Sequence, residues 1–519
     1  MAVPVIFTKV HQSLSENDED SERGDTYMAA QSPTTLPAAV LWVPRCLRYG
    51  PDAPIEATGI SVDKWAMGPV FMSSMFLGPA LLQLASQAAG CDFHEDADSI
   101  CDKTVYGFRP SSLLSNMAVA SGLLVPIVLP LVGAIVDHTP YRKQVAASAG
   151  IGLALVKGIE IAVGPSTWFF ITILQVTSAI LYNIHVTATY AYNSELSSHP
   201  DVQANYNAFY SMIQYMSMLS FLVIVLLLSG YLGTDDVGTA RLSQTITSST
   251  ALILFAFSWR YLFDDRPPTS AVRPGQSLVT SGFSKVWEST QRISRQYKAL
   301  KWVICSLMFA EAAMSALATI ATTFATEVLK MNATDIGLLF LVVLVMGIPG
   351  SWLAGWITVR LQSPIRSCML CNGIFIIVTA SAASMLTGPE HKGVAYIYGA
   401  LWGLLMGWLS PVDTTMFISV MPKDSRAEFM GIFMLAVSVL AWLPPLAFSV
   451  LNEAGINMAW GLASLNLFFM LAALCLLRIM GEYQQAVQEV QEESVEMLQG
   501  MEKSQAGTIG LEEKKHELL

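Results

Sequence analysis

Long apolar runs alternate with short polar links along most of this chain, and this alternation constrains the fold more than any other feature. Twelve such runs lie between residues 65 and 480. Each is close to the roughly 20 residues that an α-helix needs to cross a bilayer. Backbone polar groups find no water inside a bilayer, so spanning runs of this length form helices. The sequence therefore predicts an all-α polytopic membrane protein with twelve transmembrane helices.

The runs divide into two sets of six on either side of residues 263–300, a polar, Pro-containing and basic link. They lie at about 65 to 88, 112 to 136, 145 to 163, 168 to 192, 207 to 231, 243 to 262, 301 to 326, 335 to 359, 367 to 387, 394 to 420, 428 to 451 and 457 to 479. We therefore expect an N-terminal six-helix half (65–262), a cytoplasmic linker (263–300) and a C-terminal six-helix half (301–480). A disordered cytoplasmic tail with an interfacial segment (1–64) precedes them, and an acidic cytoplasmic tail (481–519) follows.

Composition and charge placement agree with a membrane protein. Charged residues make up only 13% of the chain, about half the usual share in soluble domains. Most Lys and Arg of the loops fall on the side that carries both tails and the linker. The other side receives only Lys103, Arg109, Arg241, Lys330 and Lys392. Because basic loops stay in the cytoplasm, both termini are predicted to be cytoplasmic.

The chain has none of the usual motifs of catalysis. It contains no P-loop, no HExxH zinc motif and no G-x-S-x-G nucleophile elbow. We therefore expect no enzyme activity, no cofactor, no bound metal and no nucleic-acid partner. Cys368 and Cys371 have no second cysteine pair nearby, which favours helix packing over redox or zinc chemistry. Cys46, Cys305 and Cys475 are also interpreted as packing residues.

Cys91 and Cys101 lie together in the first outward loop, where an oxidising compartment would allow a disulfide between them. Two free thiols are the alternative. The acidic residues between the two cysteines, with His94, could instead bind a cation loosely.

The most specific motif lies between the second and third runs: Gly133, Asp137, Arg142 and Lys143. A glycine lets two helices approach closely, and a carboxylate can cap a helix end of the other half or bind its cations. The Arg–Lys pair is expected at the cytoplasmic surface. Such a set can act as a latch that holds one conformation of a rocking transporter.

This motif resembles the loop signature of the major facilitator superfamily, G-x-x-x-D followed by a basic cluster, although the usual second glycine is missing. A degenerate copy follows the eighth run, where Gly350, Gly355 and Arg360 remain but the carboxylate is lost. The resemblance implies two related halves. It also implies an asymmetric latch, with Asp137 on one side alone.

A narrower resemblance extends over the membrane core. Asp63-Lys-Trp65-Ala66, residues 130–143, residues 421–433 and the stretch from Tyr192 to Leu196 are similar to the vacuolar amino-acid effluxer family associated with autophagy. The last stretch lacks that family's proline. The resemblance implies transport across the membrane of a vacuole or lysosome, with amino acids as substrates.

Polar residues at helical spacing indicate where a solute could pass, because polar groups that face lipid without a partner are costly. The seventh run carries such a stripe on one helix face, and so does the fourth. The stripes are Glu311, Ser315, Thr319, Thr322 and Thr326, and Gln175, Ser178, Tyr182, His185 and Thr189. Gln214 of the fifth run and Asp413 of the tenth run add to the predicted substrate or proton path. In the superfamily that the chain resembles, the first, fourth, seventh and tenth spans line the path.

Several of these residues have a structural alternative. Asp413 could cap a helix or pair with Lys423 or Arg426, and His185 could be a hydrogen-bonded core residue. Lys157 and Glu160 are interpreted as a structural pair. Glu311 lies deep within its run, where a carboxyl group could exchange protons near the pH of an acidic lumen.

The sequence thus predicts a secondary transporter that moves small polar solutes, amino acids in the first place, out of a vacuole or lysosome by alternating access. Its partners would be the solute, the lipid bilayer and, through Glu311, protons. The alternatives are a cation-coupled sugar or drug carrier, and a nutrient receptor that keeps the transporter fold without transport. The plasma membrane is the alternative location.

Overall fold

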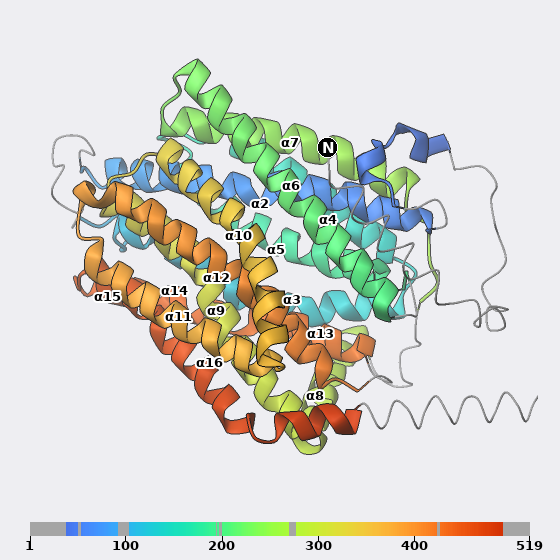
Figure 1. The fold of residues 1–519 in the computed structure, drawn as a ribbon. Helices are drawn as coiled ribbons and strands as arrows, with labels where there is room; N and C mark the ends of the chain where they lie inside the picture. The colour runs from blue at the N-terminus through green and yellow to red at the C-terminus, as the bar shows by residue number, and fades with distance from the viewer. Residues whose placement is uncertain are drawn as a thin grey trace, which may run out of the picture.

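The computed structural model describes residues 38–49, 53–91, 103–193, 195–196, 200–268, 277–422 and 426–490. Within these ranges every regular element is a helix. The long helices run side by side in one bundle (Figure 1). The described chain begins and ends on the side of the bundle that also carries the linker. We call this side the linker end and the opposite side the far end.

The first group of helices precedes the linker. It consists of α2 (Ile55–Ala88), α3 (Leu113–His138), α4 (Arg142–Glu160), α5 (Trp168–Asn193), α6 (Pro200–Leu232) and α7 (Asp236–Tyr261). Two short 3-10 helices, η1 (Ala38–Trp42) and η2 (Arg45–Leu47), lie before α2, and η3 (Pro110–Ser112) leads into α3. The helix α2 begins at Ile55 rather than near residue 65, so the end of the predicted tail belongs to the first helix.

The linker forms a helix of its own, α8 (Leu278–Gln296), and the second group follows it. This group consists of α9 (Lys298–Glu327), α10 (Ala333–Leu361), α11 (Pro364–Met385), α12 (Lys392–Ser419), α13 (Arg426–Val439), α14 (Leu443–Glu453), α15 (Met458–Ala463) and α16 (Leu465–Ile479). The 3-10 helix η4 (Pro389–His391) precedes α12. The last two predicted runs each correspond to a pair of helices, α13 with α14 and α15 with α16.

Ten helical segments of the described chain are long and apolar enough to cross a membrane. The third and sixth predicted runs coincide with α4 and α7, which are not among these ten because they carry more polar residues. The protein is therefore an all-helical membrane protein. The count of twelve spans and the placement of both termini in the cytoplasm stay predictions.

Local sequence explains where several helices start. The side chain of Asp235 accepts a hydrogen bond from the backbone of Gly238 at the start of α7. Ser277 with Thr280 and Asn332 with Asp335 form capping boxes at the starts of α8 and α10. Such caps satisfy backbone N–H groups that have no partner within the helix.

Packing separates the helices into two groups on either side of the linker. One large apolar core, from Ile293 to Tyr483, joins the helices after the linker. Smaller cores join α2 to α3, α4, α5 and α7. A further cluster spans both groups, where Phe76 of α2 and Phe221 of α6 meet Ala333 of α10. This arrangement agrees with two helical halves that meet along a shared interface.

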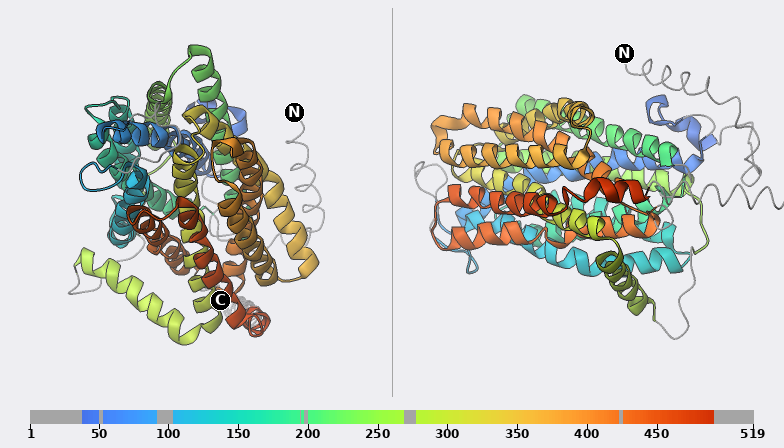
Figure 2. Two further views of the ribbon diagram at one scale, coloured as in Figure 1. Left: turned by 90° about the vertical axis from the view of Figure 1, so that its left-hand side faces the viewer. Right: turned by 60° about the horizontal axis from the view of Figure 1, so that its bottom comes forward.

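The helix α8 lies outside the bundle and crosses the direction of the spanning helices, as Figure 2 shows. It packs against α3 through Gly282, where an added Cβ atom would lie 2.2 Å from the carbonyl oxygen of Pro130. The linker is thus held close to the latch motif at the end of α3.

Candidate functional site

Two carboxylates of the second half lie close together inside the bundle. Asp413 of α12 is 1% exposed, and one of its oxygens accepts a hydrogen bond from Cys368 of α11 at 3.1 Å. Its other oxygen has no hydrogen-bond partner. Glu311 of α9 is half-buried and close enough to both side chains to interact electrostatically. Neither carboxylate is in an ion pair with a described cation.

The cysteines beside this pair act through packing and hydrogen bonds. Cys368 and Cys371 are buried free thiols, and Cys371 contacts the carbonyl oxygen of Leu405 at 3.6 Å. Asn372 donates to Cys368, while its amide oxygen has no partner. The C-x-x-C pair therefore packs beside Asp413, with Cys368 in direct contact with it. Its interpretation as helix packing agrees with this placement.

The polar stripe of α9 divides into an accessible and a buried part. Glu311 and Thr319 are half-buried and Ser315 is exposed, whereas Thr322 and Thr326 lie inside the packing. The hydroxyl groups of Ser315, Thr322 and Thr326 donate to carbonyl oxygens of α9 itself. The first three residues of the stripe are therefore the ones that a solute could reach.

The first half brings Gln175 into a buried polar chain. The amide oxygen of Gln175 accepts from Lys157 of α4 at 2.8 Å, and its amide nitrogen donates to Ser74 of α2 at 2.6 Å. Lys157 is buried and forms an ion pair with Glu160 at 3.0 Å. Lys157 and Glu160 are thus a buried pair that orients Gln175.

Tyr182 and Gln214 connect α5 with α6. The two side chains interact through a hydrogen bond, and both are half-buried. Ser178, one turn before Tyr182, is buried in the packing. From the other half, Glu311 lies near Tyr215, the residue that follows Gln214. Gln214 and Tyr215 therefore belong to the part of the first half that approaches Glu311.

His185 lies in the core of the first half rather than on an open wall. Its Nδ1 atom contacts the carbonyl oxygen of Ala146 at 2.9 Å, and its Nε2 atom contacts Asp63 at 2.9 Å. The indole nitrogen of Trp259 donates to the same carboxylate. Asp63 and His185 are 1% and 0% exposed. The structure thus favours the alternative that His185 is a hydrogen-bonded core residue, and it adds Asp63 as its partner.

The latch motif differs from the expected arrangement in its partners. Asp137 forms an ion pair with Lys285 of α8 at 2.8 Å, so its carboxylate binds the linker and not a cation of the second half. The position of Gly133 is open, because an added Cβ atom would meet nothing within 4 Å. The glycine that permits close helix approach here is Gly282 of α8.

The two basic residues of the motif, Arg142 and Lys143, also lie in different environments. Arg142 is buried, donates to Glu195 at 2.6 Å and lies over the ring of Tyr192, which corrects its expected place at the surface. Arg266 binds Glu195 and Glu56. Burial lowers the pKa of Arg266, but the hydrogen bonds and charges of these two carboxylates outweigh burial and raise it overall. Lys143 has no ion pair with a described residue.

A further set of contacts, which no sequence motif predicted, joins the two halves at the far end. The backbone N–H of Arg109 donates to Glu453 at 2.8 Å, and its guanidinium donates to the carbonyl oxygen of Asn452. Asn452 also donates to Ser111 and Ser112. We call these five residues the far-end seal. The only sequence signal was Arg109 among the few basic residues on that side.

The predicted disulfide is described in part. Cys91 is disulfide-bonded, whereas Cys101 and the acidic residues 92–100 lie outside the described residues, so the pairing stays a prediction.

In the part of the chain that the structure describes, no three His, Cys, Asp or Glu side chains form a group that could hold a metal ion.

Comparison with known families and curated proteins gives three matches. Residues 66–445 match the family profile described as the Major Facilitator Superfamily. Autophagy-related protein 22 of Kluyveromyces lactis is 24% identical over 204 residues, which cover 37% of this chain and 40% of that protein. Autophagy-related protein 22-1 of Aspergillus clavatus is 23% identical over 239 residues, which cover 44% of this chain and 38% of that protein. The chain therefore spans about two fifths of the length of these relatives.

Solved transporter structures share the fold. A mutant of the nucleoside transporter NupG has a TM-score of 0.52 at 13% identity and covers 82% of this chain and 99% of its own. A D-xylose-proton symporter has a TM-score of 0.52 at 14% identity, with coverage of 81% and 97%. The xylose transporter XylE from E. coli, in an inward-open conformation, has a TM-score of 0.50 at 13% identity, with coverage of 80% and 94%. At these identities the likeness concerns the fold alone.

Proposed function

Because the chain belongs to the Major Facilitator Superfamily, we propose that it is a secondary transporter that carries amino acids by alternating access of its two halves. The family and the fold make it a transporter rather than an enzyme. The choice of amino acids rests on the motifs that resemble the vacuolar effluxer family. The matches to Autophagy-related protein 22 support the resemblance to an autophagy-associated family.

The observation that carries this proposal is the carboxylate pair of Glu311 and Asp413. A carboxylate without a cation beside it can bind the ammonium group of a solute, or a proton, without first breaking an ion pair. On the first half, Gln214 and Tyr215 approach Glu311 and could bind the polar groups of the same solute. A small polar solute with a cationic group fits these residues best.

Transport by purified protein in liposomes tests the proposal. Labelled amino acids, sugars and nucleosides are offered in turn, with and without a pH gradient. We expect uptake or exchange of amino acids and background rates with the others. Transport of a sugar or nucleoside without any amino acid would replace this proposal by the second candidate, a cation-coupled carrier of such solutes. Specific binding without any transport would indicate a receptor.

Proton coupling is proposed to depend on Glu311. The substitution Glu311→Gln removes the titrating group, so we expect solute exchange to persist while acceleration by a pH gradient is lost, because exchange needs only reorientation of the loaded carrier. Glu327→Gln is the matched control, since Glu327 is a buried glutamate on the same helix that is not close to Asp413 in any described contact. If the Glu311→Gln protein responds to the gradient as the parent does, Asp413 becomes the candidate to test.

The proposed location is the membrane of a vacuole or lysosome, with export towards the cytoplasm. It rests on the same resemblance and on the autophagy-related relatives. Fractionation of cells that express the tagged chain tests the location. Recovery with plasma-membrane markers instead would contradict it and leave the transport proposal intact.

A further inference from the structure

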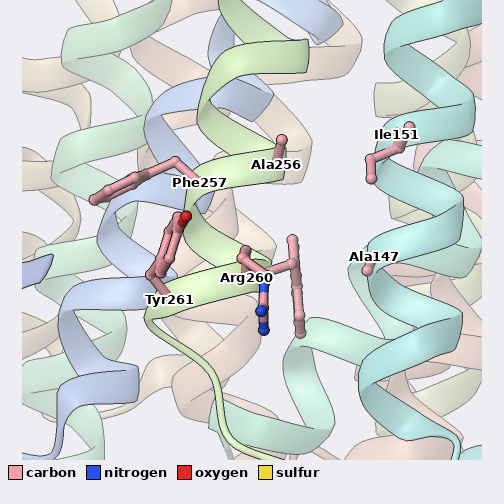
Figure 3. A pocket seen from close by; sticks show the side chains of 7 residues that line it. Ala147, Ile151, Ala256, Phe257, Arg260 and Tyr261 are labelled. Atoms are coloured by element: carbon pink, nitrogen blue, oxygen red, sulfur yellow. The ribbon is translucent and has the colours of Figure 1, made fainter.

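A groove opens on the outer surface of the first half between α4 and α7. It has a volume of about 580 Å³ and is lined by Ala147 and Ile151 of α4 and by Ala256, Phe257, Trp259, Arg260 and Tyr261 of α7. Figure 3 shows the two alanines and Ile151 along the space between the helices, with Arg260 near its lower end. Ala256 and Arg260 are exposed, while Trp259 is buried and forms the floor. The groove is thus apolar along its length and cationic at one end.

The cationic end of the groove coincides with the linker end of both helices. Arg260 lies in the last turn of α7, which ends at Tyr261. Lys143 lies in the first turn of α4, one turn before Ala147 and two turns before Ile151 on the same face. By its position in α4, Lys143 therefore lies at the same end of the groove as Arg260.

Neither cation is neutralised by a described carboxylate. Arg260 makes a cation–π contact with Tyr261. Neither Arg260 nor Lys143 forms an ion pair with a described residue. The acidic groups at this end are Asp264 and Asp265, which follow α7. Asp265 accepts a hydrogen bond from Gln144. Two basic side chains thus remain available to an anion at the linker end of the groove.

From this arrangement we propose that the groove binds an anionic phospholipid, with an acyl chain between α4 and α7 and its phosphate on Arg260 and Lys143. An arginine binds phosphate through two parallel hydrogen bonds, and basic pockets between membrane helices suit anionic headgroups. A peptide would need partners for its backbone groups along the groove, and Ala147, Ile151 and Ala256 offer none. A soluble anion would leave the apolar part of the groove unused.

The bound lipid would contact the core of the first half through the groove floor. Trp259 lines the groove, and its indole nitrogen donates to Asp63, the partner of His185. This inference does not depend on the transported solute.

Lipid binding to the full-length protein in detergent tests the inference. Native mass spectrometry and the apparent unfolding temperature are measured during titration with dioleoyl phosphatidylglycerol, dioleoyl phosphatidylcholine and glycerol 3-phosphate. We expect the parent to bind phosphatidylglycerol in preference to phosphatidylcholine, with no effect of glycerol 3-phosphate. The variant Arg260→Gln should weaken phosphatidylglycerol binding about tenfold, because it loses a charge-assisted contact to phosphate. Ala147→Phe, which fills the apolar part, should also weaken it.

The matched control is Arg360→Gln. Arg360 is an exposed arginine in the last turn of α10 that lies over Trp356 as Arg260 lies over Tyr261, but it does not line the groove. Equal losses for Arg360→Gln and Arg260→Gln would overturn the inference, and so would unchanged binding by Ala147→Phe. Competition by glycerol 3-phosphate would show an anion site without a lipid. The substituted positions are exposed or half-buried, and equal unfolding temperatures without lipid verify that each variant is folded.

Discussion

His185 shows at the scale of one residue how partners define a role. Both of its ring nitrogens face acceptors, the carbonyl oxygen of Ala146 and the carboxylate of Asp63. The pair is therefore a buried unit that ties α5 to α2 and α4.

Removal of one member of this unit should destabilise the first half. We expect His185→Ala to lower the free energy of unfolding by about 3 to 5 kcal/mol, because Asp63 would keep only Trp259 as a partner inside the core. Thermal unfolding of purified protein measures the effect. Asn183→Ala is the control, since Asn183 is half-buried and donates only to its own helix. Similar unfolding temperatures for both variants would contradict a structural role of His185.

The ion pair of Asp137 and Lys285 should act on conformation rather than on stability. Both side chains are partly exposed, at 33% and 49%, and such pairs contribute less than about 1 kcal/mol. We expect Asp137→Lys to reduce transport with little change in unfolding temperature, because α8 is released from the end of α3. The exchange of both charges, Asp137→Lys with Lys285→Asp, should restore transport. If the double variant does not regain transport, the ion pair of Asp137 and Lys285 is not required for it.

At the scale of elements, glycines set the distance between α10 and α12. An added Cβ atom at Gly403 would lie 2.2 Å from the carbonyl oxygen of Val343, and one at Gly407 would lie 2.1 Å from that of Gly347. On the opposite helix, an added Cβ atom at Gly350 of α10 would lie 2.2 Å from the carbonyl oxygen of Leu404 of α12. Close backbone approach of this kind is the usual role of small residues at four-residue spacing in membrane helices.

A methyl group in this contact should therefore be costly. We expect Gly403→Ala to destabilise the second half by roughly 1 to 3 kcal/mol, since the two helices must separate to admit it. Gly373→Ala on α11 is the control, because an added Cβ atom there meets nothing within 4 Å. Unfolding temperatures of the two variants give the comparison. If the unfolding temperature falls no more for Gly403→Ala than for Gly373→Ala, the two helices admit the methyl group without loss of stability.

At the scale of the whole molecule, the far-end seal holds the two halves together on one side. Arg109, Ser111 and Ser112 of the first half bind Glu453 and Asn452 of the second. A transporter that rocks its halves must break such contacts whenever the far end opens. The described conformation is therefore one in which the far end is held shut.

Weakening the seal should shift the population towards a far-end-open state. We expect Asn452→Ala with Glu453→Gln to increase the labelling rate of a reporter, Ser115→Cys, by a membrane-impermeant thiol reagent added on the far side. Ser115 is buried behind the seal, so it should react only when the halves part. Lys392→Gln, a change at a half-buried lysine at the same end, is the control. Equal labelling rates in both backgrounds would mean that the five residues do not control opening.

Much of the fold could be predicted from the sequence because helix formation in a membrane depends on local composition. Every predicted run coincides with one helix or a pair of helices, whereas the division into two halves on either side of the linker stays a prediction. The boundaries differ where polar residues continue a helix, as at Ile55 of α2. The roles of the predicted site residues stay predictions, but the structure shows where these residues lie. The stripe around Glu311 includes accessible residues, whereas Ser178 and His185 of the other stripe are packed, because helical spacing identifies a shared face but not what covers it.

The sequence by itself determined that this chain is a helical membrane transporter of the Major Facilitator Superfamily. Apolar length and the motif at Asp137 are properties of short stretches. Only the tertiary structure decided which polar groups meet. Asp63 and His185 are 122 positions apart, and Arg109 and Glu453 are 344 positions apart. Such pairs form because packed helices bring them together, and no local pattern along the chain specifies a partner at that distance.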